Sequence, residues 1–272
     1  MNDPIRHHYV PQCYLRKFSK DKININYFDK GLNAFKTEKI EEFCQENNLY
    51  YLAQNKDHYL IETKFFSREN EVKLGDLLKF FEFISSKFNK IEFNKDRRLK
   101  LSYQIVLQYM RTPKFRNNKS SNELNAYLTQ IKYLFERCYE IELEEIAFTY
   151  EGAEFHKNIL LDKNYINDIA LEISNCEWEL LTINSEEFYT SDNPVAIIER
   201  QDMPVVYCDA IKYFDHIYFP LNPQLLLHIT SKVCNSFKSL TIREIDDIER
   251  TNINSIIKNK ADKFIIYQNE LK

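Results

Sequence analysis

The sequence predicts a single α+β domain over residues 1–272, in which a central helical bundle packs with a small, mainly antiparallel sheet formed by N- and C-terminal strands. Three observations predict this fold. Apolar and polar residues alternate near the N-terminus, apolar residues recur with a helical period through the middle of the chain, and short apolar runs separated by turn residues fill the last third.

The N-terminal part begins with a segment that cannot form a long helix, because Pro4 and Pro11 interrupt it. A strand follows where Ile23, Ile25 and Tyr27 alternate with polar residues. The expected elements are a strand over 23–28, a hairpin turn at Gly31 and Asn33 leading into 34–35, a short helix over 37–44 that Thr37 would cap, and a short strand over 48–52.

The middle of the chain is predicted to be helical, because its apolar residues keep to one face at a period near 3.6. Gly75 is a candidate break in the first helix, and Pro113 is expected to stop the second. The expected helices cover residues 62–88, 95–110, 122–145 and, with a weaker pattern, 156–173.

The last third changes to short strands separated by turn residues such as Asn222 and Pro223. One helix is expected in it, with Thr241 as cap and Glu244 three residues on, which is the spacing of a capping box. The expected strands cover 178–183, 187–190, 195–198, 216–219, 225–230 and 264–267, and the helix covers 241–260.

Composition excludes several classes of function. The chain has 37 basic and 41 acidic residues, so it lacks the strongly basic balance of a duplex-DNA binder. Its three glycines, Gly31, Gly75 and Gly152, are too far apart to build a phosphate-binding loop. The six cysteines have no CxxC spacing, which favours free thiols over disulfides or a zinc site. Without a signal peptide or an apolar run of about 20 residues, no membrane partner and a cytoplasmic location are expected.

The densest motif covers residues 6–18, RHHYVPQCYLRKF, and is called the N-terminal motif segment below. Together with three later stretches, QYMRTP at 108–113, TSDNPV at 190–195 and YFPLNP at 218–223, it resembles an uncharacterised, largely bacterial family, domain of unknown function 4238. The resemblance covers nearly the whole chain. Cys13 and Lys17 depart from the usual Phe and Asn, as packing or surface changes. Because the family name carries no activity, the chemistry is argued from the residues.

His7 and His8 are candidate proton-transfer groups, because imidazole titrates near neutral pH. In an extended segment they point to opposite sides, so only one would enter a given cleft. Gln12 and Arg16 lie close in sequence and are candidate substrate contacts. The alternative, with similar weight, is structural: one histidine bonds the backbone while the other packs.

Arg111 and Asp192 complete the candidate site. A guanidinium could clamp a phosphate or carboxylate, with Gln108 beside it, although a cation at a helix C-terminus is also favourable by itself. Asp192 could orient a histidine or act as a base or metal ligand, with Asn193 as a neutral donor. The stronger interpretation of Asp-Asn-Pro is ordinary turn chemistry.

Carboxylates elsewhere give little evidence for a metal site. Glu62 and Glu69 are seven residues apart and would share one face of an α-helix, which is more typical of a solvated face than of a site with His8 or Asp192. No metal ligand is therefore assigned, and the sequence identifies no cofactor. The remaining histidines, His58, His156, His216 and His228, show no partner pattern.

The sequence thus predicts a hydrolase of a phosphodiester or nucleotide, with a ribonuclease-like chemistry and RNA or a nucleotide as ligand. His8 would be the general acid and base, His7 and Asp192 would support it, and Arg111 would bind phosphate charge. Gln12, Arg16, Asn193 and Gln108 would contact substrate. The alternative is a non-catalytic module for ligand sensing or protein interaction, in which the same motifs bind an anion or hold the fold. Whether the chain is an enzyme, and its oligomeric state, stay open.

Overall fold

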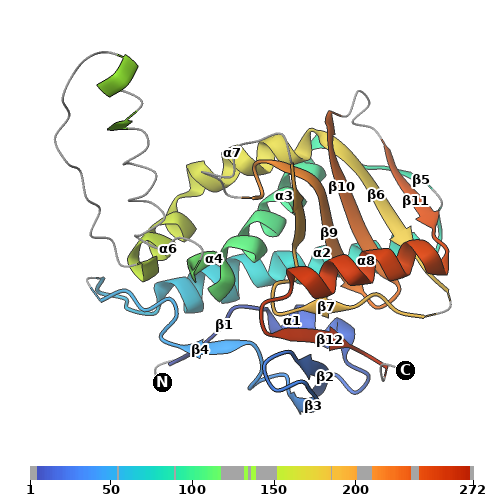
Figure 1. Ribbon diagram of the computed structural model, residues 1–272, viewed down its shortest axis with the longest axis horizontal. Helices are drawn as coiled ribbons and strands as arrows, with labels where there is room; N and C mark the ends of the chain where they lie inside the picture. Colours follow the sequence, from blue (N-terminus) through green and yellow to red (C-terminus); the bar gives the residue numbers. More distant parts are fainter. Residues whose placement is uncertain are drawn as a thin grey trace.

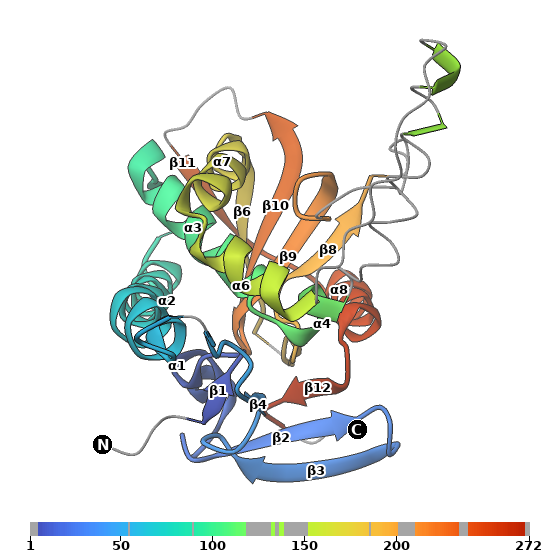
Figure 2. The same cartoon turned by 90° about the vertical axis from the view of Figure 1, so that its left-hand side faces the viewer.

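The computed structural model describes residues 5–53, 55–88, 90–117, 132–133, 136–138, 152–184, 186–200, 210–233 and 239–269 (Figures 1 and 2). Its strands are β1 (Arg6–His8), β2 (Asn24–Asp29), β3 (Ala34–Lys39), β4 (Gln45–Asn47), β5 (Lys90–Glu92), β6 (Cys176–Thr182), β7 (Thr190–Ser191), β8 (Ala196–Glu199), β9 (Phe214–Asn222), β10 (Leu225–Val233), β11 (Ser239–Glu244) and β12 (Phe264–Tyr267). Its α-helices are α1 (Gln12–Leu15), α2 (Glu71–Ser85), α3 (Lys95–Met110), α4 (Pro113–Asn117), α6 (Gly152–Leu161), α7 (Lys163–Ser174) and α8 (Asp247–Lys260). A 3-10 turn, η1 (Arg16–Phe18), follows α1, and a π-helix, η2 (Ile61–Asn70), precedes α2.

The largest sheet lies between two helical layers. Its order is β5-β11-β6-β10-β9-β8, antiparallel except for the parallel pair of β11 and β6. Figure 2 shows α3 and α7 on one side of it and α8 on the other. Alternation along β10 explains this arrangement: Leu225 and Leu227 belong to the main core, and Leu226 to a smaller core with Ile253 and Ile257 of α8.

A second sheet joins the two ends of the chain. Its order is β3-β2-β12-β7, and Ile265 of β12 pairs with Phe28 of β2 and Ser191 of β7. The expectation of a mixed fold whose sheet unites N- and C-terminal strands is therefore confirmed in its coarse form. The finer picture differs, because β5 comes from the middle of the chain and the larger sheet is built mostly from the last third.

The N-terminal motif segment belongs to neither of these two sheets. β1 pairs only with β4, in a two-stranded antiparallel sheet, and α1 follows directly (Figure 1). Among the described residues, one edge of β1 thus has no strand partner. The segment contacts α2 through α1, and η1 contacts β9 of the large sheet.

The predicted helix over 37–44 is wrong. Thr37 lies in β3, where its hydroxyl donates to Asn26 Oδ1 at 2.8 Å across the hairpin. Asp29 Oδ1 accepts hydrogen bonds from the backbone N–H groups of Gly31 and Leu32, and this tight turn fixes a register that continues to Lys39. The strand expected over 48–52 is also wrong, because β4 ends at Asn47 and a left-handed residue, Asn48, turns the chain.

The observed helix boundaries agree best with the predicted ones where a capping residue directly precedes the helix. α3 covers the predicted 95–110, with the Asn94 side chain accepting from the N–H of Arg97. The helix predicted over 62–88 is instead η2 followed by α2, and the change falls at Asn70 rather than Gly75. The helix predicted over 156–173 is divided into α6 and α7 by the cap residue Asp162.

The predicted capping box at Thr241 is wrong as well. Residues 241–244 belong to β11 and pair with β6, so α8 begins only after Asp246, whose side chain caps it. Most of the helix predicted over 122–145 lies outside the described residues. No helix in the described ranges combines the length and the hydropathy needed to cross a membrane.

Candidate functional site

Two side chains at the C-terminal end of α3, Gln108 and the cap residue Arg111, bind the carbonyls of the last residue of β1 and of the residue after it. Arg111 donates through a terminal guanidinium nitrogen to the carbonyl of His8, and Gln108 Nε2 donates to the carbonyl of Tyr9 at 3.1 Å. The two residues are three apart, so they share one helix face. Buried carbonyls need donors, and β1 has no second strand neighbour to supply them. The motif at 108–113 therefore supplies donors for two carbonyls at the end of β1.

The Arg111 guanidinium is enclosed by the protein. The residue is 3% exposed, lies 3.1 Å from Glu71 Oε1 and stacks over the Phe66 ring at 4.0 Å. The Tyr50 hydroxyl donates to the Arg111 carbonyl at 2.6 Å. The predicted phosphate clamp thus has its terminal donors turned towards groups of the protein itself.

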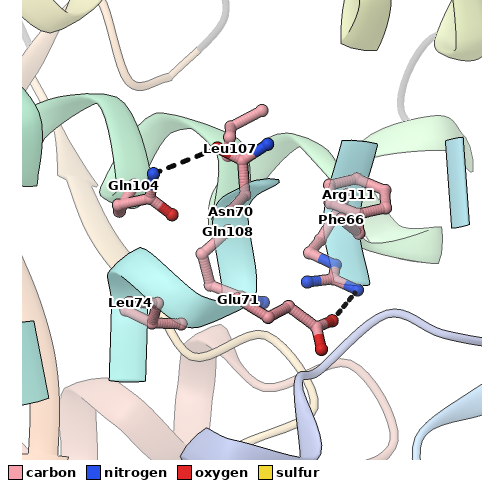
Figure 3. A pocket seen from close by; sticks show the side chains of 8 residues that line it. All are labelled: Phe66, Asn70, Glu71, Leu74, Gln104, Leu107, Gln108 and Arg111. Atoms are coloured by element: carbon pink, nitrogen blue, oxygen red, sulfur yellow. Dashed lines mark hydrogen bonds and ion pairs between the residues drawn. The ribbon is translucent and has the colours of Figure 1, made fainter. Parts of the chain in front are cut away.

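A small space lies beside this guanidinium (Figure 3). Its lining residues are Phe66, Asn70, Glu71, Leu74, Gln104, Leu107, Gln108 and Arg111. It has room for about one water molecule, so it is not a substrate pocket. Arg111 Nε and Gln108 Oε1 are buried without a hydrogen-bond partner among the described residues. A donor and an acceptor of this kind are the groups that a buried water connects.

Two carboxylates face Arg111, and the π-helix explains which two. Hydrogen bonds in a π-helix run from i to i+5, so each turn holds more residues than an α-turn. Side chains nine apart, Glu62 and Glu71, therefore come together, whereas Glu69, at the α-helical spacing, is exposed. Burial raises the pKa of Glu62 to about 7, although Arg111 and the backbone N–H of His8 favour the ionised form. Sequence analysis missed Glu71 because it assumed an α-helical spacing.

His8 is the half-buried member of the histidine pair. Its Nε2 lies 3.2 Å from the carbonyl of Glu41 and 3.4 Å from Gln12 Nε2. One turn further, Arg16 donates to Gln12 Oε1 at 2.7 Å, and Arg16 is exposed. Burial, and then the nearby Arg111 guanidinium, lower the pKa of the His8 imidazole. His8, Gln12 and Arg16 thus form a connected polar row that reaches the surface.

His7 points to the other side of the strand, as the alternation of an extended segment predicts. It is fully buried, its Nδ1 accepts from the backbone N–H of Tyr50 at 2.9 Å, and its ring stacks on Tyr50. The edge of Tyr59 packs against the same imidazole. His7 therefore ties β1 to the turn after β4.

Asp192 and Asn193 lie at the end of β7, against the turn between α8 and β12. Asp192 accepts hydrogen bonds from the backbone N–H groups of Asp262 (3.0 Å) and Lys263 (2.7 Å). Asn193 donates to the carbonyl of Lys260 at 3.1 Å. Burial raises the pKa of Asp192 to about 6, against the effect of these N–H donors. Within the described part of the chain, Asp192 makes no hydrogen bond or ion pair with His8 or Arg111.

Tyr14 joins the remaining motifs to the N-terminal motif segment. Its buried hydroxyl donates to the carbonyl of Pro220 at 2.7 Å and lies 2.6 Å from Thr190 Oγ1. Its ring stacks on Phe219. The segment thus contacts all three other motifs, through Arg111 and Gln108 at one end and Tyr14 at the other. Sequence analysis did not single out Tyr14, because a tyrosine among apolar residues gives no signal of its own.

The sequence also gave no partner for His216 and His228, and the structure pairs them: His216 Nδ1 lies 2.9 Å from His228 Nε2. The turn at Asn222 and Pro223 could have indicated this, since it folds β9 back on β10 with Tyr218 opposite His228. Among the described residues, no group of three or more His, Cys, Asp or Glu could hold a metal ion. Cys13, Cys44, Cys138 and Cys176 are free thiols.

The fold and these contacts define a mixed α/β protein whose N-terminal segment is held by contacts with three distant parts of the chain. The family model described as "Protein of unknown function (DUF4238)" matches residues 6–270, so the chain belongs to that family. The comparison with curated proteins gives no match, and neither does the comparison with solved structures.

Proposed function

We propose that the protein hydrolyses phosphodiester bonds in RNA or a nucleotide, with His8 as the general base. The observation that carries this proposal is the polar row of His8, Gln12 and Arg16. It combines an imidazole whose pKa is lowered, and which is therefore neutral at pH 7, with an exposed guanidinium one helical turn away. A neutral imidazole accepts protons, and a guanidinium binds phosphate.

The residues around the row have separate roles. His8 takes the proton of the attacking hydroxyl or water, and Arg16 and Gln12 contact the phosphate oxygens. Arg111 is a positioning residue, because it holds the carbonyl of His8 rather than facing solvent. His7 positions the same strand from its other side. Gln108, Asp192 and Asn193 contact backbone groups and support the proposal only through the fold.

The test is cleavage of a single-stranded RNA oligonucleotide and of bis(p-nitrophenyl) phosphate. Loss of a general base typically costs on the order of 100-fold or more in rate, so we expect His8→Ala to fall by that factor. Arg16→Gln should raise KM more than it lowers kcat. His58→Ala is the matched control, because His58 is also half-buried and its Nδ1 lies 2.8 Å from the carbonyl of Leu52. Equal rates in wild type and His8→Ala, with both folded, would overturn the assignment.

A non-catalytic module is the second candidate, and one observation favours it: His7, Arg111 and Asp192 all use their side chains on backbone groups. In that case nucleotides would raise the melting temperature without being turned over. Thermal unfolding with and without nucleotides and divalent cations, run beside the cleavage assay, separates the two candidates.

A further inference from the structure

The large sheet carries a polar cluster on the face that α8 shares. α8 packs over one end of this face, on Leu181, Ala196 and Leu226, and crosses the strands there (Figure 1). Beyond Leu226 the same face of β10 continues with His228 and Thr230, which are half-buried. On the part of the face that α8 does not cover, apolar side chains are thus replaced by polar ones.

Two imidazoles form the centre of this cluster. His216 of β9 and His228 of β10 are diagonal neighbours across the strand pair, with Nδ1 and Nε2 2.9 Å apart. Their rings stack with centroids 5.2 Å apart, and Tyr218 stacks on His228 at 4.7 Å. The aromatic row fixes both rings, so the contact between the two nitrogens is directional.

The carboxylate of Glu179 lies next to the His228 imidazole, on the neighbouring strand β6. Glu179 of β6 lies directly opposite His228, with Oε2 3.7 Å from His228 Nδ1. This is an electrostatic contact rather than a hydrogen bond, and among the described residues the buried Nδ1 has no hydrogen-bond partner. Arg243 is 3.5 Å from the same carboxylate and is itself held by both oxygens of Glu249, at 2.7 and 2.8 Å. The contact with His228, against the effect of burial, and then Arg243 lower the pKa of Glu179. Glu179 is therefore an anion at neutral pH.

The charge of Glu179 favours one placement of the protons on the two rings. An anionic Glu179 favours the proton of His228 on Nδ1, which leaves His228 Nε2 as an acceptor. His216 Nδ1 then donates to it, and His216 Nε2 is left with its lone pair. Among the described residues, the hydrogen bond of the His216 ring is the one made at Nδ1. The arrangement follows the logic by which a carboxylate orients a catalytic histidine, extended by a second ring.

We propose that Glu179, His228 and His216 form a second acid–base site, in which His216 Nε2 is the base for hydrolysis of small, neutral carboxylic esters. The charges nearby favour a neutral substrate over a phosphodiester. Three carboxylates, of Glu179, Glu249 and Asp215, outnumber the two cations of Arg243 and Lys232.

In the proposed step, His216 Nε2 takes a proton from water while the water oxygen bonds to the ester carbonyl carbon. The bond from that carbon to the leaving oxygen then breaks, and the leaving group takes the proton back from His216. Glu179 and His228 are positioning residues, because they stabilise the imidazolium without touching substrate. No metal or redox partner enters the balance.

The experiment uses the full chain and p-nitrophenyl acetate. We expect His216→Ala to lower the protein-dependent rate by about tenfold or more, while His58→Ala leaves it unchanged and so accounts for the intrinsic reactivity of an ordinary histidine. Glu179→Gln should lower the pH midpoint of the rate profile, because the imidazolium loses its carboxylate. A merely structural role for Glu179 would change the rate without moving that midpoint.

Circular dichroism verifies that each variant is folded. If folded His216→Ala retains the wild-type rate, or if His58→Ala loses as much, the proposal is overturned. For a variant that fails to fold, 15N chemical shifts of the wild-type imidazoles provide the second measurement. The proposal requires His228 to carry its proton on Nδ1 and His216 to carry its own on Nδ1, and the opposite tautomers would refute it. RNA cleavage does not enter this test, so failure here leaves the His8 proposal unaffected.

Discussion

Replacing Arg111 by methionine should be among the most damaging single changes in the protein. Methionine keeps much of the apolar stem but removes the charge, so Glu62 and Glu71 lose their cation and the His8 carbonyl loses its donor. Removing one partner of a buried ion pair typically costs about 3–5 kcal/mol. At roughly 2–4 °C per kcal/mol for a chain of this size, the melting temperature should fall by about 10 °C.

The matched control is Lys100→Met on the same helix. Lys100 lies 2.8 Å from Asp96, but both side chains are about two-thirds exposed. Exposed pairs of this kind contribute about 0.3–0.5 kcal/mol. Thermal and urea unfolding of both variants, at pH 8 and pH 5, test the reasoning. Arg111→Met should be less destabilised at pH 5, because Glu62, whose pKa burial raises to about 7, then holds a proton and needs no cation. If the free energy of unfolding of Arg111→Met falls by no more than about 1 kcal/mol beyond that of Lys100→Met, the role of Arg111 as a buried ion-pair partner is refuted.

Three further changes test other buried groups. Wild type should lose stability relative to Glu62→Gln as the pH rises from about 4.5 to 7, by up to about 1.4 kcal/mol per pH unit. The reason is that the raised pKa keeps Glu62 protonated to a higher pH in the folded state than in the unfolded chain. Thermal unfolding of both proteins across this pH range would show no divergence if burial does not perturb the pKa of Glu62. Burial lowers the pKa of His156 to about 4, so wild type should lose stability as the pH falls from 6.5 through 4, and urea titrations of His156→Gln should lack that slope. Tyr14→Phe should lose about 1–3 kcal/mol in urea unfolding, since it leaves the Pro220 carbonyl without its donor and the Thr190 hydroxyl without its acceptor. Tyr27→Phe, which loses one 3.2 Å bond to Glu38, should lose less, and equal losses would contradict the role given to Tyr14.

Elements with local signals could be predicted from the sequence. α3 begins at the cap Asn94 and ends before Pro113, and β12 is a short apolar run between turn residues. Predicted elements were wrong where pairing with a strand distant in sequence determines the secondary structure. Thr241 and Glu244 have the spacing of a capping box, but β6 recruits both into β11. Local propensity carries no information about such a neighbour.

The candidate site was predictable only as a set of segments. The motif segments that the sequence indicates do meet, through Arg111 and Gln108, which it ranked, and through Tyr14, which it did not. The carboxylate that pairs with Arg111, Glu71, was not ranked either. Tyr14 reaches Thr190 and Pro220 across gaps of 176 and 206 residues, for which one sequence contains no signal. Glu71 required knowing that the preceding ten residues form a π-helix, whose turns differ from those assumed.

The use of each polar group decides which residues remain available for chemistry. A segment without a second strand neighbour leaves buried N–H and C=O groups that must be satisfied, and in this chain side chains satisfy them. Arg111, Gln108 and Asp192 already make hydrogen bonds to backbone groups of the protein itself. They are therefore not available to a substrate, although their residue types are common in catalytic sites. The imidazole of His216 differs, because its contact is with another ring, and that of His8 differs because, besides lying 3.2 Å from the carbonyl of Glu41, it is half-buried and continues into a polar row that reaches the surface. If the protein is an enzyme, its reacting groups should be found at these two histidines rather than among the buried motif residues.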